Sequence, residues 1–201
     1  TGASGLVGSR LVPALLAGGA RVVTLQRRPV PSADPRAEVI EGDLLEPSSY
    51  AAALDGVTTV VHLAAATGGA TAEDHFRINQ QGTEMLLEQC RRHGVEDVVF
   101  VSTIAVKFGD KRRYHYAQAK ELAEEAVRAS GLGWLILRPT IVAGPGAPVL
   151  LGMRRLAMLP VIPLFGAGRA RVQPVWIDDL VDGDGVSSPV ERLSLPLSVA
   201  P

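Results

Sequence analysis

The sequence predicts an α/β fold built on a doubly wound parallel sheet. Short β-branched runs alternate along the chain with segments of helical periodicity, which is the order expected of such a sheet. Residues 58–63 form a continuous apolar run without alternation, typical of a parallel strand covered on both faces. The chain also opens on a glycine-rich turn, of the kind that joins a strand to a helix in these folds. Strands and helices of a single α/β layer structure should therefore follow one another.

The elements are expected in a regular order. Apolar residues at helical spacing predict a first helix over 9–17, which Gly18 and Gly19 end, and a β-branched strand follows over 21–26. A short strand at 37–41 and a helix near 48–54 precede the apolar strand at 58–63. Beyond it the same alternation predicts further elements: a helix over 76–93, a strand over 97–102, a helix over 117–130 and a strand over 134–138.

Both ends of the chain depart from this pattern. A glycine-rich turn is normally held by a preceding buried strand, yet the chain begins inside the turn at Thr1, so the first strand is expected to be missing. The regular pattern continues through Leu180 and then gives way to a stretch rich in Gly, Ser and Pro. We interpret residues 183–201 as an irregular tail, either a flexible terminus or an altered or truncated reading frame.

Composition excludes several classes of function. The 201 residues carry 20 basic and 21 acidic side chains, a formal charge of −1, which gives no attraction for nucleic acid. The single cysteine, Cys90, forms no internal disulfide and makes no metal cluster with His93 alone, and it suits a reducing compartment. No apolar stretch approaches the roughly 20 residues that span a bilayer, and no signal segment opens the chain. We expect a cytoplasmic protein with no metal, membrane or nucleic-acid partner.

The opening turn predicts a phosphate site. Glycines at positions 2, 5 and 8 allow a tight turn, close approach to a pyrophosphate and close packing of the next helix. The helix that begins near Leu6 offers free amides and the positive end of its dipole to phosphates. The candidate cofactor-binding residues of this turn are Gly2, Ser4, Gly5, Leu6, Val7 and Gly8.

Two arginines follow the next strand, where an acidic residue would bind the ribose hydroxyls of NAD. The guanidinium groups of Arg27 and Arg28 suit a 2′-phosphate, so NADP(H) is favoured and NAD(H) stays open; the alternative is a solvated loop with two surface arginines. Asp43, with Leu44, follows the third strand, where its carboxylate could accept a hydrogen bond from the adenine amino group or could cap a helix.

Several motifs in order resemble the short-chain dehydrogenase/reductase superfamily, in its extended and atypical branch of NAD-dependent epimerases and dehydratases. The resemblance covers about residues 1–180. The matching segments are Thr1 to Gly8 (TGxxGxxG), His62 to Ala65 (HxAA), Asn79 with Gly82 and Thr83, Ser102 and Thr103, Tyr116 to Lys120 (YxxxK), and Arg138-Pro139 with Gly144-Pro145-Gly146.

This resemblance implies a Rossmann-like NAD(P)-binding domain over 1–147 and the beginning of a substrate-binding lobe over 148–182. Segments 165–168 and 175–180 resemble the approach to that lobe. It implies Thr103, Tyr116 and Lys120 as catalytic residues, with Ser102 adjacent as the alternative to Thr103. Tyr116 and Lys120 would also hold the cofactor, together with Ala64, Ala65, Pro139 and Ile141.

The YxxxK spacing has a physical basis. A free tyrosine has a pKa of about 10 and is a poor base at neutral pH unless a positive charge stabilises its phenolate. Positions i and i+4 share one face of a helix, so Lys120 is expected to supply that charge to Tyr116 and to hold the nicotinamide ribose. Thr103 would orient the reacting oxygen, and Asn79 would anchor a water or backbone group, or be a simple polar helix residue.

The predicted function is an NAD(P)-dependent oxidoreductase, epimerase or dehydratase acting on a hydroxyl or keto group of a nucleotide sugar or another small alcohol. The alternative is a dinucleotide-binding module without turnover, because residues 124–139 resemble atypical members such as a respiratory-complex accessory subunit and redox-sensing regulators. The basic runs at 111–113 and 153–155 could meet a substrate phosphate or be solvated surface. His62 is a candidate for a hydrogen-bonded histidine in the core. The oligomeric state is left open, with a homodimer as one possibility.

Overall fold

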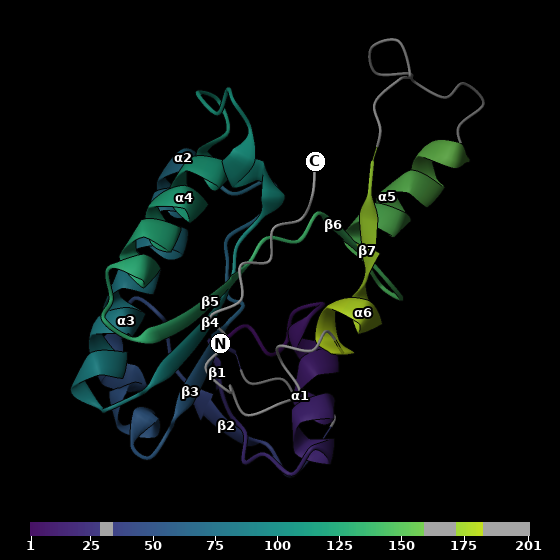
Figure 1. The fold of residues 1–201 in the computed structure, drawn as a ribbon. Coiled ribbons are helices and arrows are strands. Elements are labelled where there is room, and N and C mark those ends of the chain that lie inside the picture. Colours follow the sequence, from purple (N-terminus) through teal and green to yellow (C-terminus); the bar gives the residue numbers. More distant parts are fainter. Residues whose placement is uncertain (29–33, 159–171, 183–201) are drawn as a thin grey trace.

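The computed structural model describes residues 1–28, 34–158 and 172–182. Two parallel sheets carry the Rossmann-like part (Figure 1): β1 (Val23–Gln26) pairs with β2 (Glu38–Glu41), and β3 (Thr59–His62), β4 (Asp97–Val101) and β5 (Gly133–Leu137) form the other. A third parallel pair joins β6 (Ile141–Ala143) and β7 (Pro174–Trp176). All four pairings between the described strands are parallel, as the alternation of strands and helices predicted.

Thr1 occupies a ladder position beside β3. Its amino group donates to the carbonyl of Val61 at 2.8 Å, and its own carbonyl accepts from the amide of Leu63 at 3.2 Å. This is the hydrogen-bond pattern of a parallel pair. The glycine-rich turn therefore starts directly from the edge of β3.

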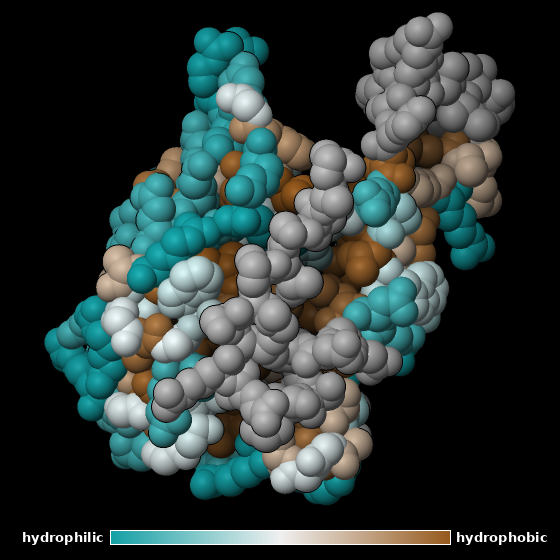
Figure 2. Space-filling model, viewed as in Figure 1, coloured by the Kyte–Doolittle hydropathy of each residue, from teal (hydrophilic) through white to brown (hydrophobic). Residues whose placement is uncertain are grey.

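Helices cover both sides of the strands (Figure 1). Helices α3 (Gly82–Arg92) and α4 (His115–Arg128) lie on one side, and α1 (Gly8–Ala17) lies on the other. The core between β3, β4 and the first two of these helices is a continuous apolar cluster that includes Val60, Leu86, Cys90, Phe100 and Val127. Figure 2 shows apolar atoms gathered in the middle of the molecule and hydrophilic ones on the outer side of α4.

Two predicted helices differ from the structure. Residues 48–54 form two short 3₁₀ helices, η1 (Pro47–Ser49) and η2 (Ala51–Leu54), because the Ser49 hydroxyl bonds the backbone carbonyl of Glu46 at 2.6 Å and competes with a continuous helix.

The helix predicted over 76–93 starts earlier and is not uniform. It comprises α2 (Ala72–Asp74), the π-helical turn η3 (His75–Gln81) and α3. The Thr83 hydroxyl donates to the carbonyl of Asn79 at 2.7 Å, and such back-bonding bends helices.

The described residues after β5 form two further helices besides the β6–β7 pair. Helix α5 (Pro148–Ala157) follows β6, while α6 (Ile177–Asp182) follows β7 and packs against α1. Ile177 is fully buried, and its side chain lies where a Cβ on Gly144 would be only 2.4 Å away. The predicted segment at 165–168 and the tail at 183–201 lie outside the described residues.

Candidate active site

The strand register brings the predicted site residues to one edge. His62 pairs with Phe100, and Phe100 pairs with Ile136, so β3, β4 and β5 end side by side. Ligands of open α/β sheets bind outside the carboxyl ends of the strands. The residues that follow these three ends are Ala64 and Ala65, Ser102 and Thr103, and Pro139.

The glycine turn is as tight as its spacing predicted. Gly2 has φ of 75°, and its carbonyl accepts from the amide of Gly5 at 3.0 Å. A Cβ on Gly2 would lie 2.6 Å from the Ala64 amide nitrogen, and one on Gly8 would lie 2.4 Å from the Gly2 carbonyl oxygen. The turn therefore packs directly on the end of β3 and on the first turn of α1.

The start of α1 suits a pyrophosphate. Among the described residues, the backbone amides of Ser4, Leu6 and Val7 donate no hydrogen bond, and Val7 caps the helix without a side-chain bond. The first turn of α1 has no acidic residue. Free amides at a helix N-terminus behind a glycine turn form an anion site, so the residues present fit the diphosphate of a dinucleotide.

The ends of β1 and β2 carry the predicted adenosine-side residues. Arg27 and Arg28 are exposed directly after β1. The Asp43 carboxylate accepts from the amide of Leu45 at 2.9 Å in a local turn, and Asp43 is not the cap of the helix that follows, because the N-cap residue of η1 is Glu46. Leu44 is buried in the core, where it leaves no room for a Cβ on Gly82.

Tyr116 lies in the first turn of α4, at an open pocket of about 480 Å³. Its ring meets the His75 ring edge-on with centroids 5.7 Å apart. Burial and the neighbouring Tyr114 raise the pKa of Tyr116 to about 12. The lining residues are Thr67, Gly68, Ala70, Ala72, His75, Arg113, Tyr114, His115 and Tyr116.

Lys120 lies one turn further along α4 and is buried, with 1% of its surface exposed. Its Nζ atom is 3.9 Å from the centroid of the Phe100 ring on β4. Burial lowers the pKa of Lys120 to about 7, against a smaller opposing effect of Glu124. No hydrogen bond joins Lys120 to Tyr116 among the described residues, so the expected lowering of the tyrosine pKa by the lysine is wrong for this state of the molecule.

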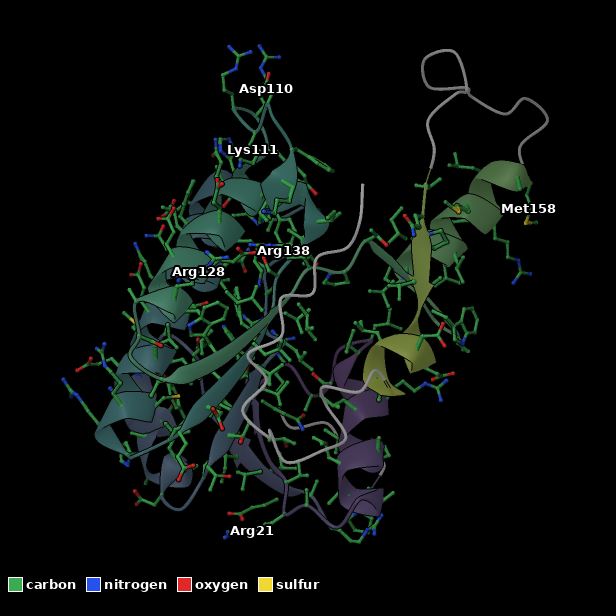
Figure 3. The ribbon with its side chains drawn as sticks, in the orientation of Figure 1. Arg21, Asp110, Lys111, Arg128, Arg138 and Met158 are labelled. Carbon is green, nitrogen blue, oxygen red and sulfur yellow. The ribbon has the colours of Figure 1, made fainter. Side chains whose placement is uncertain are left out.

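A buried ion-pair cluster, which the sequence alone did not single out, follows one turn later (Figure 3). The Glu124 carboxylate is 2% exposed and accepts from Arg138 Nε at 2.8 Å and from Arg128 at 2.7 Å. Burial would raise the pKa of Glu124, but these hydrogen bonds outweigh it and lower the pKa to about 2. The cluster joins α4 to the end of β5. In the sequence, Glu124 is recognisable only as the fourth residue after Lys120, a spacing that places both on one face of the helix.

Thr103 and Ser102 follow β4 and differ in environment. Thr103 is half-buried, and its hydroxyl accepts from the Ala105 amide at 3.3 Å, which caps η4 (Ile104–Lys107). The Ser102 hydroxyl is buried and makes no hydrogen bond of ordinary geometry. The Pro139 carbonyl accepts from the Ile104 amide, which fixes this loop beside the end of β5.

Asn79 and His62 anchor the backbone around the end of β3. The Asn79 carboxamide accepts from the Ala66 amide at 2.7 Å and donates to the Ala66 carbonyl at 2.9 Å, so it holds a backbone group of the loop after β3. His62 is buried between the hydroxyls of Thr1 and Thr83, at 2.6 and 3.0 Å. It is the hydrogen-bonded core histidine that the sequence offered as an alternative, and burial lowers its pKa.

The remaining candidates lie outside this arrangement. Lys111 is paired with Glu121 and Arg112 with Asp110, while Arg113 lines the Tyr116 pocket (Figure 3 labels Asp110 and Lys111). In the described part of the chain no three His, Cys, Asp or Glu residues are placed to hold a metal, and no helix is long and apolar enough to cross a membrane. Burial raises the pKa of the Cys90 thiol to about 11.

Known proteins are similar to this chain in sequence and in fold. The model of an NAD(P)H-binding family matches residues 2–147. A ceramide reductase of Caulobacter vibrioides is 34% identical over 183 residues, which cover 89% of this chain and 56% of that protein. A 3β-hydroxysteroid dehydrogenase/Δ5→4-isomerase of Mycobacterium tuberculosis is 31% identical, with 91% of this chain and 57% of that protein covered.

A solved structure of MoeE5 with UDP-glucuronic acid and NAD has a TM-score of 0.78 and 30% identity, covering 90% of this chain and 68% of that one. The chain spans little more than half the length of the curated relatives it matches. The match of the NAD(P)H-binding model and these relatives agree with the order of motifs along the chain. The chain belongs to the extended branch of the short-chain dehydrogenase/reductase superfamily, with its NAD(P)H-binding domain over residues 2–147.

Proposed function

We propose that the chain is the cofactor-binding and catalytic part of an NADP(H)-dependent enzyme that acts on a hydroxyl or keto group. One observation carries the proposal: Tyr116 lines an open pocket and is followed, one helical turn on, by a buried lysine. The free amides of the glycine turn lie beyond the end of β3, at the same edge of the sheet. A family that binds NAD(P)H supplies the cofactor chemistry that this pair of side chains requires.

The side chains have distinct roles in this proposal. A bound nicotinamide supplies or accepts the hydride. Tyr116 gives or takes the proton of the substrate oxygen at its Oη atom, and the hydroxyl of Thr103 orients that oxygen. Lys120 leaves the Phe100 ring, approaches the Tyr116 hydroxyl and the nicotinamide ribose, and lowers the tyrosine pKa. Ala64, Ala65, Pro139 and Ile141 would hold the cofactor when it is bound.

Arg27 and Arg28 support the preference for NADP(H). Both are exposed at the end of β1, where a charge-assisted hydrogen bond to a 2′-phosphate is worth about 1.5–3 kcal/mol, or roughly 10- to 100-fold in affinity. MoeE5 was solved with NAD, so the preference needs a direct test. Titration with NADPH and NADH, followed by nicotinamide fluorescence, should give tighter NADPH binding that Arg27→Ala weakens.

Arg21→Ala is the matched control for that titration. Arg21 is an exposed arginine just before β1, and it pairs with Glu38 at 3.1 Å. It is expected to leave both affinities unchanged. Equal affinity of the native chain for NADPH and NADH would contradict the arginine assignment, and binding of neither would contradict the proposed function.

Proteins similar to this chain are associated with different classes of substrate. MoeE5 was solved with a nucleotide sugar, whereas the curated relatives are named for a ceramide and a hydroxysteroid. We propose an alcohol or ketone, with a nucleotide sugar as the first class to test. Arg113 supports it, because this residue lines the Tyr116 pocket and a guanidinium group binds phosphate well.

A second function is supported by the position of Lys120. Its ammonium lies on Phe100, and the pKa of Tyr116 is raised, a combination that suits a module which holds a dinucleotide without turnover. Tyr116→Phe separates the two functions. If the chain is an enzyme, Tyr116→Phe should lower the turnover rate by about 100-fold or more and change the NADPH affinity by no more than a few-fold. Tight NADPH binding with no turnover of any alcohol or ketone by the native chain would favour the module.

A further inference from the structure

We propose that His75 accepts a hydrogen bond from the substrate and so selects molecules with a hydroxyl or an amide N–H beside the reacting carbon. The inference rests on the proposed function, because it takes Tyr116 as the group that meets the reacting oxygen. It concerns a residue that the motifs of the family do not include. His75 opens η3, four residues before Asn79.

The position of His75 brings it to the reacting group. Its ring is 5.7 Å from that of Tyr116, centroid to centroid, with the planes at 62°. Both residues line the same pocket, one from η3 and one from α4. A molecule whose oxygen binds the Tyr116 hydroxyl therefore enters a pocket that the His75 ring also lines.

The tautomer of His75 is set by the backbone. The Nδ1 atom lies 3.2 Å from the carbonyl oxygen of Ala66, which can only accept a hydrogen bond. The same oxygen accepts from the Asn79 carboxamide, whose other end accepts from the Ala66 amide, so this peptide group cannot turn away. The neutral ring must carry its proton on Nδ1, and Nε2 then presents a lone pair.

No described residue donates a hydrogen bond to that lone pair. His75 is 7% exposed, and its Nε2 makes no hydrogen bond to any described residue. Nε2 is not among the fully buried polar atoms that lack a partner, so a ligand or water can reach it from the pocket. The side chains that line the pocket include no carboxylate and no carboxamide, so an incoming N–H or O–H donor finds its fixed acceptor on His75.

His115 is a second histidine of the pocket, and its tautomer is not fixed by the backbone. It also lines the pocket, but its Nδ1 faces the carboxamide of Gln118 at 3.1 Å. A carboxamide can present either its oxygen or its nitrogen, so the His115 tautomer is not fixed in this way. A carbonyl of the main chain has no such freedom. His115 is therefore the natural control.

The first experiment measures the ring itself. Protein with ¹⁵N-labelled histidine, loaded with NADP⁺ at about pH 8, is studied by NMR, with His75 assigned through His75→Phe. The Nδ1 resonance should be that of a protonated nitrogen and the Nε2 resonance that of a bare one. Titration with 2-hydroxycyclohexanone should shift Nε2 toward the hydrogen-bonded value, whereas cyclohexanone should not. The opposite tautomer, or an Nε2 resonance that neither ketone moves, would overturn the inference.

The second experiment measures selectivity by NADPH consumption. One neutral hydrogen bond is worth about 1 kcal/mol, so kcat/KM should favour the hydroxylated ketone by about 5- to 10-fold, mainly through KM. His75→Phe should abolish this ratio, and His115→Phe should retain it. Equal kcat/KM values of the native chain for the two ketones would contradict only the role of His75 and not the proposed function. A native chain that turns over neither contradicts the proposed function, and the Nε2 titration still decides on His75.

Discussion

The ammonium of Lys120 rests on the ring of Phe100, 3.9 Å from its centroid, and not on the hydroxyl of Tyr116. The two residues come from α4 and β4, so the lysine is held across the interface of helix and sheet. A cation over an aromatic face regains part of the hydration it loses on burial, but only part. Burial therefore leaves Lys120 a destabilising residue in the resting protein, which suits a role in binding rather than in stability.

Replacing Lys120 by Met should therefore stabilise the fold. The lysine pKa is lowered from 10.5 to about 7 by burial, so from pH 7 to 10.5 the unfolded chain binds the proton that the folded chain has lost. Stability must then rise with pH across this window, and the penalty is fully present below it. We expect Lys120→Met to raise the unfolding free energy by roughly 1–3 kcal/mol at neutral pH and to remove this rise.

Urea unfolding at several pH values checks this prediction. Lys107→Met is the control, because Lys107 is exposed at the end of η4. It should change the unfolding free energy by less than about 0.5 kcal/mol and keep the pH dependence. A Lys120→Met protein that is less stable than the native chain at pH 7 would show that the Phe100 contact outweighs the burial penalty.

Glu124→Gln should be strongly destabilising. Its carboxylate joins Arg138 and Arg128 at the end of β5, and removing one partner of a buried pair costs about 3 kcal/mol or more. The Glu124 pKa is lowered from 4.5 to about 2, so this stability is present above pH 4.5 and is lost as the pH falls toward 2. The difference between native and variant chains should shrink in the same window.

Glu121→Gln offers the comparison on the same helix. Glu121 is paired with Lys111 at 2.7 Å, but its side chain is 42% exposed against 2% for that of Glu124, and pairs open to solvent are worth about 0–1 kcal/mol. Chemical denaturation of the two variants at pH 7 separates the effects. Equal losses would mean that the Glu124 cluster contributes no more than a surface pair.

Much of this fold follows from local patterns. The five strands of the Rossmann-like part appear within a few residues of their predicted bounds, because apolar β-branched runs between turns have few other stable placements. The helices near 48–54 and 76–93 were less predictable. Their form depends on the side-chain bonds of Ser49 and Thr83 to the backbone, which compete with helix hydrogen bonds at close quarters.

The sequence predicts several residues of the site but not the contacts that they make in the folded protein. The sequence placed Tyr116 and Lys120 on one helical face, yet it could not show that burial against Phe100 draws the ammonium away. His75 and Glu124 also escaped, since a histidine or glutamate in a helix is most often a surface residue. Their roles depend on a carbonyl at Ala66 and a guanidinium at Arg138, both of which lie outside the helix that carries the side chain.

Gly2→Ala should damage the turn more than its backbone angle alone explains. A Cβ there would lie 2.6 Å from the Ala64 amide nitrogen, in addition to the strain of φ at 75°. Gly19 has φ of 84° and open space around a Cβ, so Gly19→Ala carries the strain alone, about 1–2 kcal/mol. We expect Gly2→Ala to cost at least about twice as much and to weaken NADPH binding. Thermal unfolding and nicotinamide fluorescence of both variants test this, and equal stability losses would contradict the close approach of the turn to β3.

Thr103 and Ser102 compete for the role of the hydroxyl that orients the substrate, and their surroundings decide between them. Thr103 is half-buried at the sheet edge, whereas Ser102 is buried beside the Glu124 cluster. Thr103→Ala should lower kcat by about 100-fold, with Thr103→Ser restoring most of it, because serine keeps both the hydroxyl and the cap of η4. Ser102→Ala should keep kcat within a few-fold, since its Oγ makes no hydrogen bond of ordinary geometry. Steady-state kinetics with NADPH at saturation measures all three, and a larger loss in Ser102→Ala than in Thr103→Ala would move the orienting hydroxyl to Ser102.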